Sequence, residues 1–288
     1  MNRRRGLIFA LSSSMPAMLL YFTFYLIPLV TTFVTSFFRW DKILIGEFIG
    51  FQNYINLFTD NVFYISLKNI ISWILVAVFI HIPFALMVAL ILSTRFRGWK
   101  VLRVIYFIPQ IISSVAWAII FISVFNPNYG LLNGLLKTLG LENQTCNWLF
   151  DPVWAWPSII CTWVFFIGMF TLIMLAEIIS IPDEIFEAAE IDGANKIQQA
   201  LYIKVPLIRQ TTGTCLILTV SGGIKYFDGL YIMTNGAPNF RTETLSLYLY
   251  QQFTYVHFSY ANTIGVMLLL LGIIIIRIIM RSFRMKEE

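Results

Sequence analysis

The chain has 288 residues, of which 58% are hydrophobic and only 12% are charged. Soluble globular domains carry about 25% charged residues, and one core cannot bury so much apolar surface, so the composition excludes an ordinary soluble protein. The formal charge of +5 forms no basic stripe interleaved with exposed aromatic residues, so we expect no nucleic-acid partner. The cysteines form no CxxC motif or Cys/His cluster, and neither a metal site nor a disulfide framework is indicated.

The N-terminal region begins with Arg3, Arg4 and Arg5 and then stays apolar to about Phe38. This stretch is too long for the hydrophobic region of a signal peptide, and no small-residue cleavage site ends it. We therefore expect a retained first span whose arginines lie in the cytoplasm.

Six stretches are apolar and long enough to cross a hydrocarbon core, which takes roughly 20 helical residues. The sequence thus predicts an all-α, polytopic membrane protein that contacts lipid, with spans at 7–37, 66–92, 101–125, 154–179, 205–224 and 262–280. Prolines lie within several spans, where neighbouring helices can satisfy the freed carbonyl groups and kinks are tolerated. The fifth span is the weakest, because polar residues interrupt it, and we expect these to face other helices or a water-filled path.

The basic residues orient the predicted spans. With six spans, 14 of the 20 lysines and arginines lie on the side that holds both termini and the second and fourth loops. The positive-inside rule therefore places both termini and these two loops in the cytoplasm. The other side holds Arg39, Lys42, Lys68, Lys137, Lys225 and Arg241.

The fourth loop contains signals for two short helices. Ser180 followed by Asp183 is a helix-start signal, and Gly193 can end the first helix in the left-handed conformation. A second helix over 195–202 can follow until Pro206 forces a bend. The sequence therefore predicts a compact helix–turn–helix on the cytoplasmic side. Its small residues would let another backbone approach closely, but the residues alone leave open whether it docks a partner or only joins two spans.

The spacing within this loop resembles the EAA loop of ABC importer permeases. Glu187, Ala188 and Ala189 are followed after three residues by Gly193, and after nine more by Ile-Lys-Val-Pro, where the family has Ile-x-Leu-Pro. The resemblance implies a coupling helix that seats in a cleft of an ATPase subunit. The residues that it assigns to ATPase coupling are Glu187, Ala188, Ala189, Asp192, Gly193, Ile203 and Pro206.

The flanking sequence resembles the carbohydrate branch of this family, which includes the maltose, lactose and glycerol-phosphate permeases. The run Phe227-Asp228-x-Leu230 and the later Thr242-Glu243-Thr244-Leu245 are typical of it. The resemblance implies the transmembrane domain of a type I ABC importer that takes up a sugar or oligosaccharide. It divides the chain into an N-terminal helix with an outer loop, 1–65, and a permease core, 66–288, with the coupling loop at 180–206.

The same resemblance implies a set of partners in a bacterial or archaeal cytoplasmic membrane. They are a second permease subunit that completes a heterodimer, two copies of an ATP-binding subunit, and an extracytoplasmic sugar-binding protein. The sequence has no G-x-x-x-x-G-K-[ST] loop, so it cannot hold ATP phosphates in that way. We therefore expect a transport subunit without a catalytic site or cofactor of its own, with ATP and Mg used by the partner ATPase.

The sugar path is expected to be polar and aromatic, because rings stack on sugar faces while amides and hydroxyls meet sugar hydroxyl groups. The candidates are Thr219, Ser221, Lys225, Tyr226 and Asp228, with Asn69 and Trp117 as weaker ones. Glycine, serine and threonine also serve helix packing in membranes, so this alternative stays open. The spacing of Lys225 and Asp228 would also allow a local salt bridge.

Three other functions are weighed against the importer. An ion-gradient-driven secondary transporter would need acidic residues at mid-membrane and inverted repeats, and the predicted spans show almost none of the former and none of the latter. An intramembrane enzyme would need a motif such as H-E-x-x-H or G-x-S-x-G, and neither occurs. A channel fits the composition but leaves the EAA-like loop unexplained.

Overall fold

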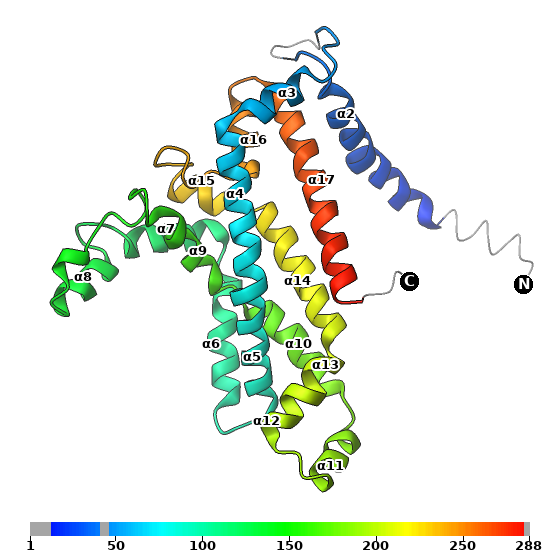
Figure 1. Ribbon diagram of the computed structural model, residues 1–288, viewed down its shortest axis with the longest axis vertical. Coiled ribbons are helices and arrows are strands. Elements are labelled where there is room, and N and C mark those ends of the chain that lie inside the picture. Colours follow the sequence, from blue (N-terminus) through cyan, green and yellow to red (C-terminus); the bar gives the residue numbers. More distant parts are fainter. Residues whose placement is uncertain (1–12, 41–45, 285–288) are drawn as a thin grey trace, which may run out of the picture. The chain divides into compact units, whose positions relative to one another are not determined.

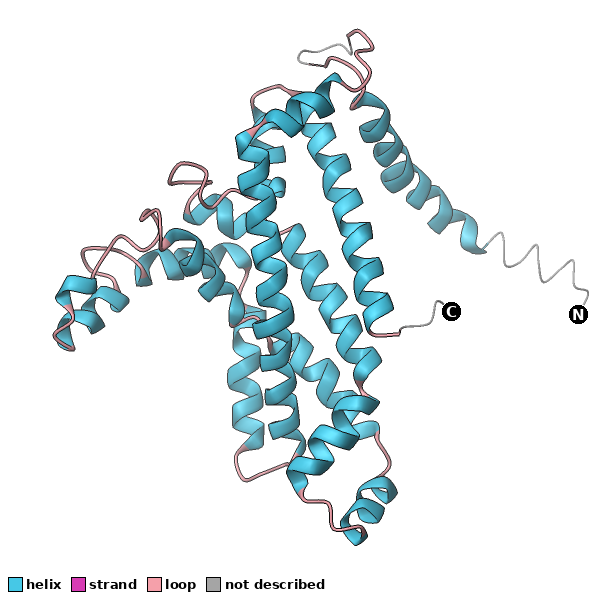
Figure 2. Ribbon diagram, in the orientation of Figure 1, coloured by secondary structure: helices cyan, strands magenta, loops and turns pink. Residues whose placement is uncertain are grey.

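The computed structural model describes residues 13–40 and 46–284. The regular secondary structure of this part of the chain is helical, apart from one isolated β-bridge between Phe38 and Phe48, which confirms the all-α prediction (Figures 1 and 2). Several residues used in the topology prediction lie outside the described residues. They are Arg3, Arg4, Arg5, Lys42, Lys286 and the first part of the predicted first span, 7–12.

The first helix is described from Ser13 to Thr35 and contains a π-helical turn. In chain order the elements are η1 (Phe22–Leu26), α2 (Ile27–Thr35), α3 (Gln52–Thr59), α4 (Asn61–Val76), η2 (Ala77–His81), α5 (Ile82–Ser93), α6 (Trp99–Ile111), α7 (Ser114–Val124), α8 (Leu131–Thr138), η3 (Glu142–Gln144), α9 (Ala155–Val164), α10 (Gly168–Ser180), α11 (Asp183–Ile191), α12 (Lys196–Gln199), η4 (Ala200–Lys204), α13 (Val205–Leu207), α14 (Arg209–Ile224), α15 (Asp228–Met233), α16 (Leu245–Thr254) and α17 (Phe258–Ser282).

Four helices in the described residues are long and apolar enough to cross a membrane. They correspond to the first, second, fourth and sixth predicted spans, and they run over Ser13–Thr35, Asn61–Ser93, Ala155–Ser180 and Phe258–Ser282. The other two predicted spans differ from a single long helix. The third is the pair α6 and α7, bent by 100° at a break, and the fifth contains α14, which has only 16 residues. The number of six spans therefore stays a prediction.

The break between α6 and α7 has a local cause. Pro109 lies inside α6, where it removes one backbone donor, and Ile112 after the helix adopts an extended conformation. Ser113 then caps α7, because its side-chain oxygen accepts a hydrogen bond from the Ala116 N–H at 3.2 Å. Apolar periodicity does not reveal such a break, since the run stays apolar on both sides of a hydroxyl cap.

Three prolines are accommodated by π-helical turns rather than by breaks. Pro28, Pro83 and Pro206 each lie at the start of the helix that directly follows η1, η2 or η4. The residue before each proline donates its N–H to a carbonyl five residues earlier, as Ile82 does to Ala77. The wider turn makes room for the pyrrolidine ring, which would otherwise clash with the preceding turn.

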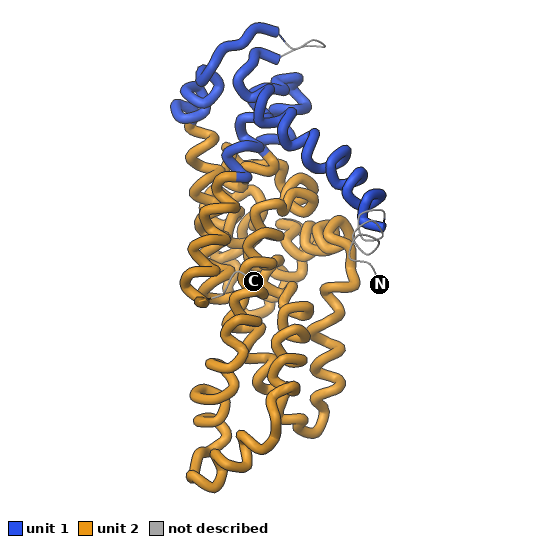
Figure 3. The backbone as a smooth tube through the Cα atoms, turned by 90° about the vertical axis from the view of Figure 1, so that its right-hand side faces the viewer, with its two compact units in different colours: residues 1–60, 248–269 blue, residues 61–247, 270–288 orange. Residues whose placement is uncertain are grey.

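The chain forms two compact units (Figure 3). Unit 1 comprises residues 1–60 and 248–269, and unit 2 comprises 61–247 and 270–288. In unit 1, Asn53 on α3 donates its side-chain amide to the carbonyl oxygens of Ser36 at 2.8 Å and Phe38 at 3.0 Å. These two bonds fix the chain that leaves α2 against α3.

Unit 2 has its core where α5 and α10 lie side by side, with α6 and α14 packed against them. Ala85, Met174 and Cys215 are fully buried there, one each from α5, α10 and α14. Helices α11 and α12 lie at the end of this group of helices, beside the loop that joins α5 to α6 (Figure 1). The loop between α10 and α14 therefore projects from the end of the helical core.

Candidate functional site

The first candidate site is the loop between α10 and α14, and it opens with helix α11. Pro182 takes the extended N-cap position, and the first turn is acidic, where the helix dipole favours carboxylates. The predicted helix start is confirmed, because α11 begins at Asp183, but the helix is not capped by Ser180. The Ser180 hydroxyl donates instead to the carbonyl oxygen of Glu177 at 2.8 Å, in the last turn of α10. A serine side chain can serve either helix, and the proline decides where the second one begins.

The end of α11 confirms the predicted left-handed glycine. Gly193 has φ +83° and donates its N–H to the Glu190 carbonyl at 3.0 Å. The N–H of Ala194 reaches back to the Ala189 carbonyl at 2.9 Å, which completes a Schellman motif. A Cβ added at Gly193 would meet no atom within 4 Å, so open space surrounds this turn.

The second helix of the loop is held by a capping box. Asn195 accepts from the Gln198 N–H at 2.9 Å, and the Gln198 side chain accepts from the Asn195 N–H at 2.8 Å. After α12 the helical turns continue through η4 and across Pro206, and they break only at Ile208. The chain therefore stays helical past Pro206, and the interruption lies two residues beyond it, at Ile208.

Lys204 connects this loop to the helical core of unit 2. Its ammonium group donates to the Ser93 hydroxyl at the end of α5 at 3.0 Å, and it lies 5.3 Å from the centre of the Phe186 ring on α11. Burial, with a smaller contribution from the nearby Lys196, lowers the pKa of Lys204 below its usual value. One cation thus contacts both α5 and the first loop helix.

The residues assigned to ATPase coupling lie on the surface of this loop. Glu187, Ala188, Asp192, Gly193 and Pro206 are exposed, and Ala189 and Ile203 are partly exposed. Large apolar side chains accompany them, since Ile191 is 86% exposed, Tyr202 77% and Ile197 71%. These exposed apolar side chains belong to the same loop as the residues assigned to ATPase coupling.

The second candidate site is a pocket of about 210 Å³ in unit 2, where two helix breaks meet. The carbonyl oxygen of Phe166, in the break between α9 and α10, accepts the Gln110 side-chain amide of α6 at 2.8 Å. A Cβ added at Gly168 would lie 2.5 Å from the Tyr106 carbonyl oxygen, so only glycine allows α6 this close to the start of α10.

Aromatic rings form much of this pocket and continue behind it. Trp163, Phe166, Phe170 and Tyr226 share the lining with the polar Gln110, Ser114 and Thr219 and the smaller or aliphatic Met169, Leu218 and Gly222. The Trp73 ring contacts Trp163 and Tyr226 with centroid distances of 4.7 and 5.3 Å. The arrangement offers ring surfaces next to a few hydrogen-bonding groups, which suits a ligand with both apolar and hydroxyl faces.

The predicted path residues do not all meet in this pocket. Thr219 and Tyr226 line it, whereas Ser221, Lys225 and Asp228 do not. The Thr219 hydroxyl donates to the Cys215 carbonyl of its own helix at 2.8 Å. Among the described residues Lys225 forms no ion pair with Asp228, which instead accepts a hydrogen bond from the Ser114 hydroxyl at 3.1 Å.

The two weaker candidates have structural partners. The Asn69 side-chain amide donates to the carbonyl oxygens of Arg241 at 2.9 Å and Glu243 at 2.7 Å. The Trp117 indole N–H donates to the Thr162 carbonyl at 3.1 Å. Both side chains hold neighbouring segments of unit 2 together and are absent from the pocket lining.

Sequence reasoning missed the residues that the helix breaks bring together, above all Gln110, Ser114 and Trp163. One signal was present, because Pro109-Gln110 and Ser113-Ser114 interrupt an otherwise apolar run. Polar residues inside an apolar span mark transport paths. Trp163 gave no such signal, since a tryptophan in an apolar helix is ordinary.

Comparison with known proteins shows which family the chain resembles. Residues 81–286 match the family described as "Binding-protein-dependent transport system inner membrane component". The chain is 33% identical over 276 residues to the probable ABC transporter permease protein YurN of Bacillus subtilis, with 94% of each chain covered. It is 30% identical over 256 residues to the trehalose/maltose transport system permease protein MalF of Thermococcus litoralis, covering 88% of this chain and 86% of that one.

A solved structure shows the same fold. It is a bacterial alginate ABC transporter in complex with a periplasmic protein that binds an alginate pentasaccharide. It superposes with a TM-score of 0.84 at 21% identity, over 98% of this chain and 95% of that chain. The chain therefore belongs to the family of binding-protein-dependent transport system inner membrane components, and it is a multi-pass permease subunit of an ABC importer, not an enzyme.

Proposed function

We propose that this permease subunit carries a sugar or oligosaccharide, and that the pocket lined by Thr219 and Tyr226 is its part of the path. The observation that carries the proposal is the lining of this pocket, where aromatic rings stand beside Gln110 and Ser114. Rings offer stacking surfaces to the C–H faces of a sugar, and amide and hydroxyl groups match its hydroxyls. Relatives named for trehalose/maltose and lactose transport support this class of substrate.

The loop between α10 and α14 is proposed to seat in the ATPase subunit. Its surface is exposed, its two helices are fixed by local hydrogen bonds, and Lys204 ties it to the end of α5. A movement imposed on α11 would therefore be passed to the helices of unit 2 rather than absorbed by the loop. ATP and Mg would act in the partner, and transport would follow from switching between two states of the permease.

The proposed assembly contains this chain, a second permease subunit, two copies of an ATP-binding subunit and an extracytoplasmic sugar-binding protein. The number of six spans with both termini in the cytoplasm, and the bacterial or archaeal cytoplasmic membrane as the location, belong to the same proposal. It is supported by the excess of lysines and arginines on one side of the predicted spans.

The experiment is to tag the chain in its host, extract it gently, and identify the proteins that co-purify. A second permease, an ATPase near two copies per complex and an outer binding protein are the expected result. The ligand carried by that binding protein then names the substrate. Purification of the chain alone, under conditions that preserve known complexes, would contradict the proposed assembly.

A further inference from the structure

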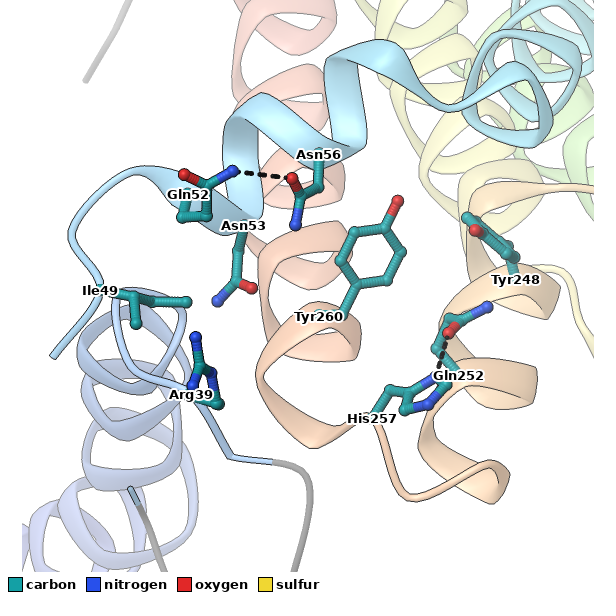
Figure 4. Close-up of a pocket in the computed structure, with 9 residues that line it drawn as sticks. All are labelled: Arg39, Ile49, Gln52, Asn53, Asn56, Tyr248, Gln252, His257 and Tyr260. Carbon is teal, nitrogen blue, oxygen red and sulfur yellow. Dashed lines mark hydrogen bonds between the residues drawn. The ribbon is translucent and has the colours of Figure 1, made fainter. Parts of the chain in front are cut away.

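A pocket in unit 1 has the lining of a ligand site, and it shares no residue with the coupling loop or with the pocket in unit 2. It lies between the loop after α2, helix α3, helix α16 and the start of α17 (Figure 4). All of its lining residues belong to unit 1. Its volume is about 360 Å³. Small-molecule sites occupy about 300–1,000 Å³, so the pocket has room for a small ligand.

The lining consists mainly of planar polar side chains. Four amide groups, an imidazole and a guanidinium face the pocket with two tyrosine rings and one aliphatic side chain, Ile49. An amide offers two donors and an acceptor in one plane. Adjacent hydroxyls on a sugar ring both donate and accept, so they pair with such groups two at a time. A lipid tail or an apolar helix would leave these groups without partners, at a cost in affinity.

Two pairs of the polar side chains in the lining are hydrogen-bonded to each other. Gln52 donates its side-chain amide to the Asn56 side-chain oxygen at 2.9 Å, and His257 Nδ1 and the Gln252 side-chain oxygen lie 2.9 Å apart (Figure 4). Each bond uses one polar atom of a side chain and leaves its other polar atoms available to a ligand. The amide N–H groups of Asn56 and Gln252 have no hydrogen-bond partner among the described residues. Such supported side chains lose little freedom when a ligand binds.

The tyrosine rings are fixed from behind in the same way. The hydroxyls of Tyr248 and Tyr260 both donate to the same carboxylate oxygen of Asp60, Tyr260 at 2.8 Å. Burial, strengthened by this bond to Asp60, raises the pKa of Tyr248, so its hydroxyl stays protonated and the bond persists. The two rings meet edge to face, with centroids 6.2 Å apart. Tyr260 stands in the middle of the pocket, between the side chains of α3 and those of α16 (Figure 4).

A peptide is a poorer match than a sugar for this pocket. Peptides bind by adding a strand to a sheet edge or a helix to an apolar groove. The described part of unit 1 has no sheet beyond the single bridge between Phe38 and Phe48, and the pocket has more polar than apolar lining. Arg39 adds a cation, whose ion pair with Glu47 at 3.9 Å leaves both side chains largely exposed.

We propose that this pocket in unit 1 is a saccharide-binding site that shares no residue with the pocket lined by Thr219 and Tyr226. The class of ligand rests on the proposed function, whereas the existence of a polar binding site at this place rests on the lining of the pocket. The sequence-based topology places both segments on the outer side of the membrane, where an imported sugar arrives. The Arg39 guanidinium would favour a sugar unit with a carboxylate.

The test uses the complete importer in lipid nanodiscs, without its binding protein. Saturation-transfer NMR measures binding of maltotriose, lactose, arabinotriose and digalacturonate as probes. At least one probe should bind, and the double variant Asn56→Ala/Gln252→Ala should weaken it about tenfold, as expected for the loss of two hydrogen bonds. Gln144→Ala is the matched control, because this amide is exposed on the short helix η3 of unit 2 and should change nothing. Arg39→Gln should weaken digalacturonate alone.

Two results would overturn the inference. They are binding of none of the probes, and equal binding by the double variant and the wild type. Tyr226→Ala separates the two pockets, because a probe held in unit 1 stays bound in that variant. Uptake of the ligand carried by the binding protein is measured in parallel. Normal uptake with a negative binding test removes this inference alone, whereas absence of any saccharide uptake removes the proposed function as well.

Discussion

The loop between α10 and α14 and the pocket lined by Gln110 and Tyr226 are both part of unit 2, but they are built in opposite ways. The loop is held mainly by bonds between close neighbours in sequence, such as the capping box of Asn195 and Gln198. The pocket is held by contacts between distant residues, such as the bond from Gln110 to the Phe166 carbonyl, 56 positions away. One is a local structure on the surface, and the other exists only when several helices have packed.

This difference predicts how each region responds to substitution. A change on the exposed loop surface removes few contacts within the chain, so it should affect the fit to a partner and leave stability nearly intact. A change in the pocket removes contacts between helices, so it should affect transport and stability together.

Gly193→Asp should have the largest effect. The added Cβ meets nothing within the chain, and aspartate tolerates the left-handed conformation better than most residues, so the free energy of unfolding should fall by only about 1 kcal/mol. The new charge would be buried in the proposed contact with the ATPase, and transport should fall more than about tenfold. Uptake and ATPase co-purification measure this.

Gly193→Asn is the matched control for that variant, because it has the same size and no charge. We expect it to insert normally and to keep more transport than the aspartate variant. Full transport and normal ATPase binding in Gly193→Asp would show that this face of the loop is not the docking surface.

Tyr226→Ala should have the next largest effect. It removes one ring of the pocket and the contact with Trp73, whose centroid lies 5.3 Å away. Loss of an aromatic pair costs about 0.5–1.5 kcal/mol beyond the buried area, so the melting temperature should fall. Loss of a ring contact of similar strength with the substrate should mean that uptake needs about two- to tenfold more substrate. Tyr226→Phe keeps the ring and should transport nearly as the wild type does. If the alanine variant behaves the same, the ring lies outside the path.

Gln110→Leu tests the break between α9 and α10. It leaves the Phe166 carbonyl without its partner, which should lower the free energy of unfolding by about 1–3 kcal/mol. Thermal unfolding of the purified complex measures this, with Gln144→Leu as an exposed control. An unchanged melting temperature would mean that the carbonyl finds another donor and that the break does not depend on Gln110.

The sequence was sufficient for the parts that local rules govern. Gly193 had to adopt positive φ because a helix ended there, and the capping residues lay within a few positions of one another. Apolar length likewise identified four long helices. The helix start after Ser180 was found, but not its capping residue, because a serine hydroxyl can serve the helix before it or the helix after it. The surrounding structure selects between them.

The pocket could not be predicted in this way. Thr219 and Tyr226 were found because the fifth span is polar. Their neighbours come from α6, α7, α9, α10 and the break between α9 and α10, and no local pattern relates these segments. The pairing proposed for Lys225 and Asp228 failed for the same reason, since spacing along the chain says nothing about Ser114, more than a hundred positions away.

Glu190→Gln should have the smallest effect on stability and transport, because it changes an exposed side chain of the loop. Hydrogen bonds from Lys196 and Gln199 lower the pKa of Glu190 below its ordinary value of 4.5, so the folded loop favours the carboxylate. This contribution is complete above pH 4.5 and is lost as the pH falls through the lowered pKa.

Because Glu190 is exposed, the wild type should melt only slightly lower at pH 4 than at pH 7, and the variant should lose part of that difference. Lys196→Gln, which removes the main partner, should do the same. Exposed ion pairs contribute little to stability, so transport at neutral pH should stay nearly normal in both variants. A large fall in transport in either variant would show that the shape of the coupling loop depends on this pair.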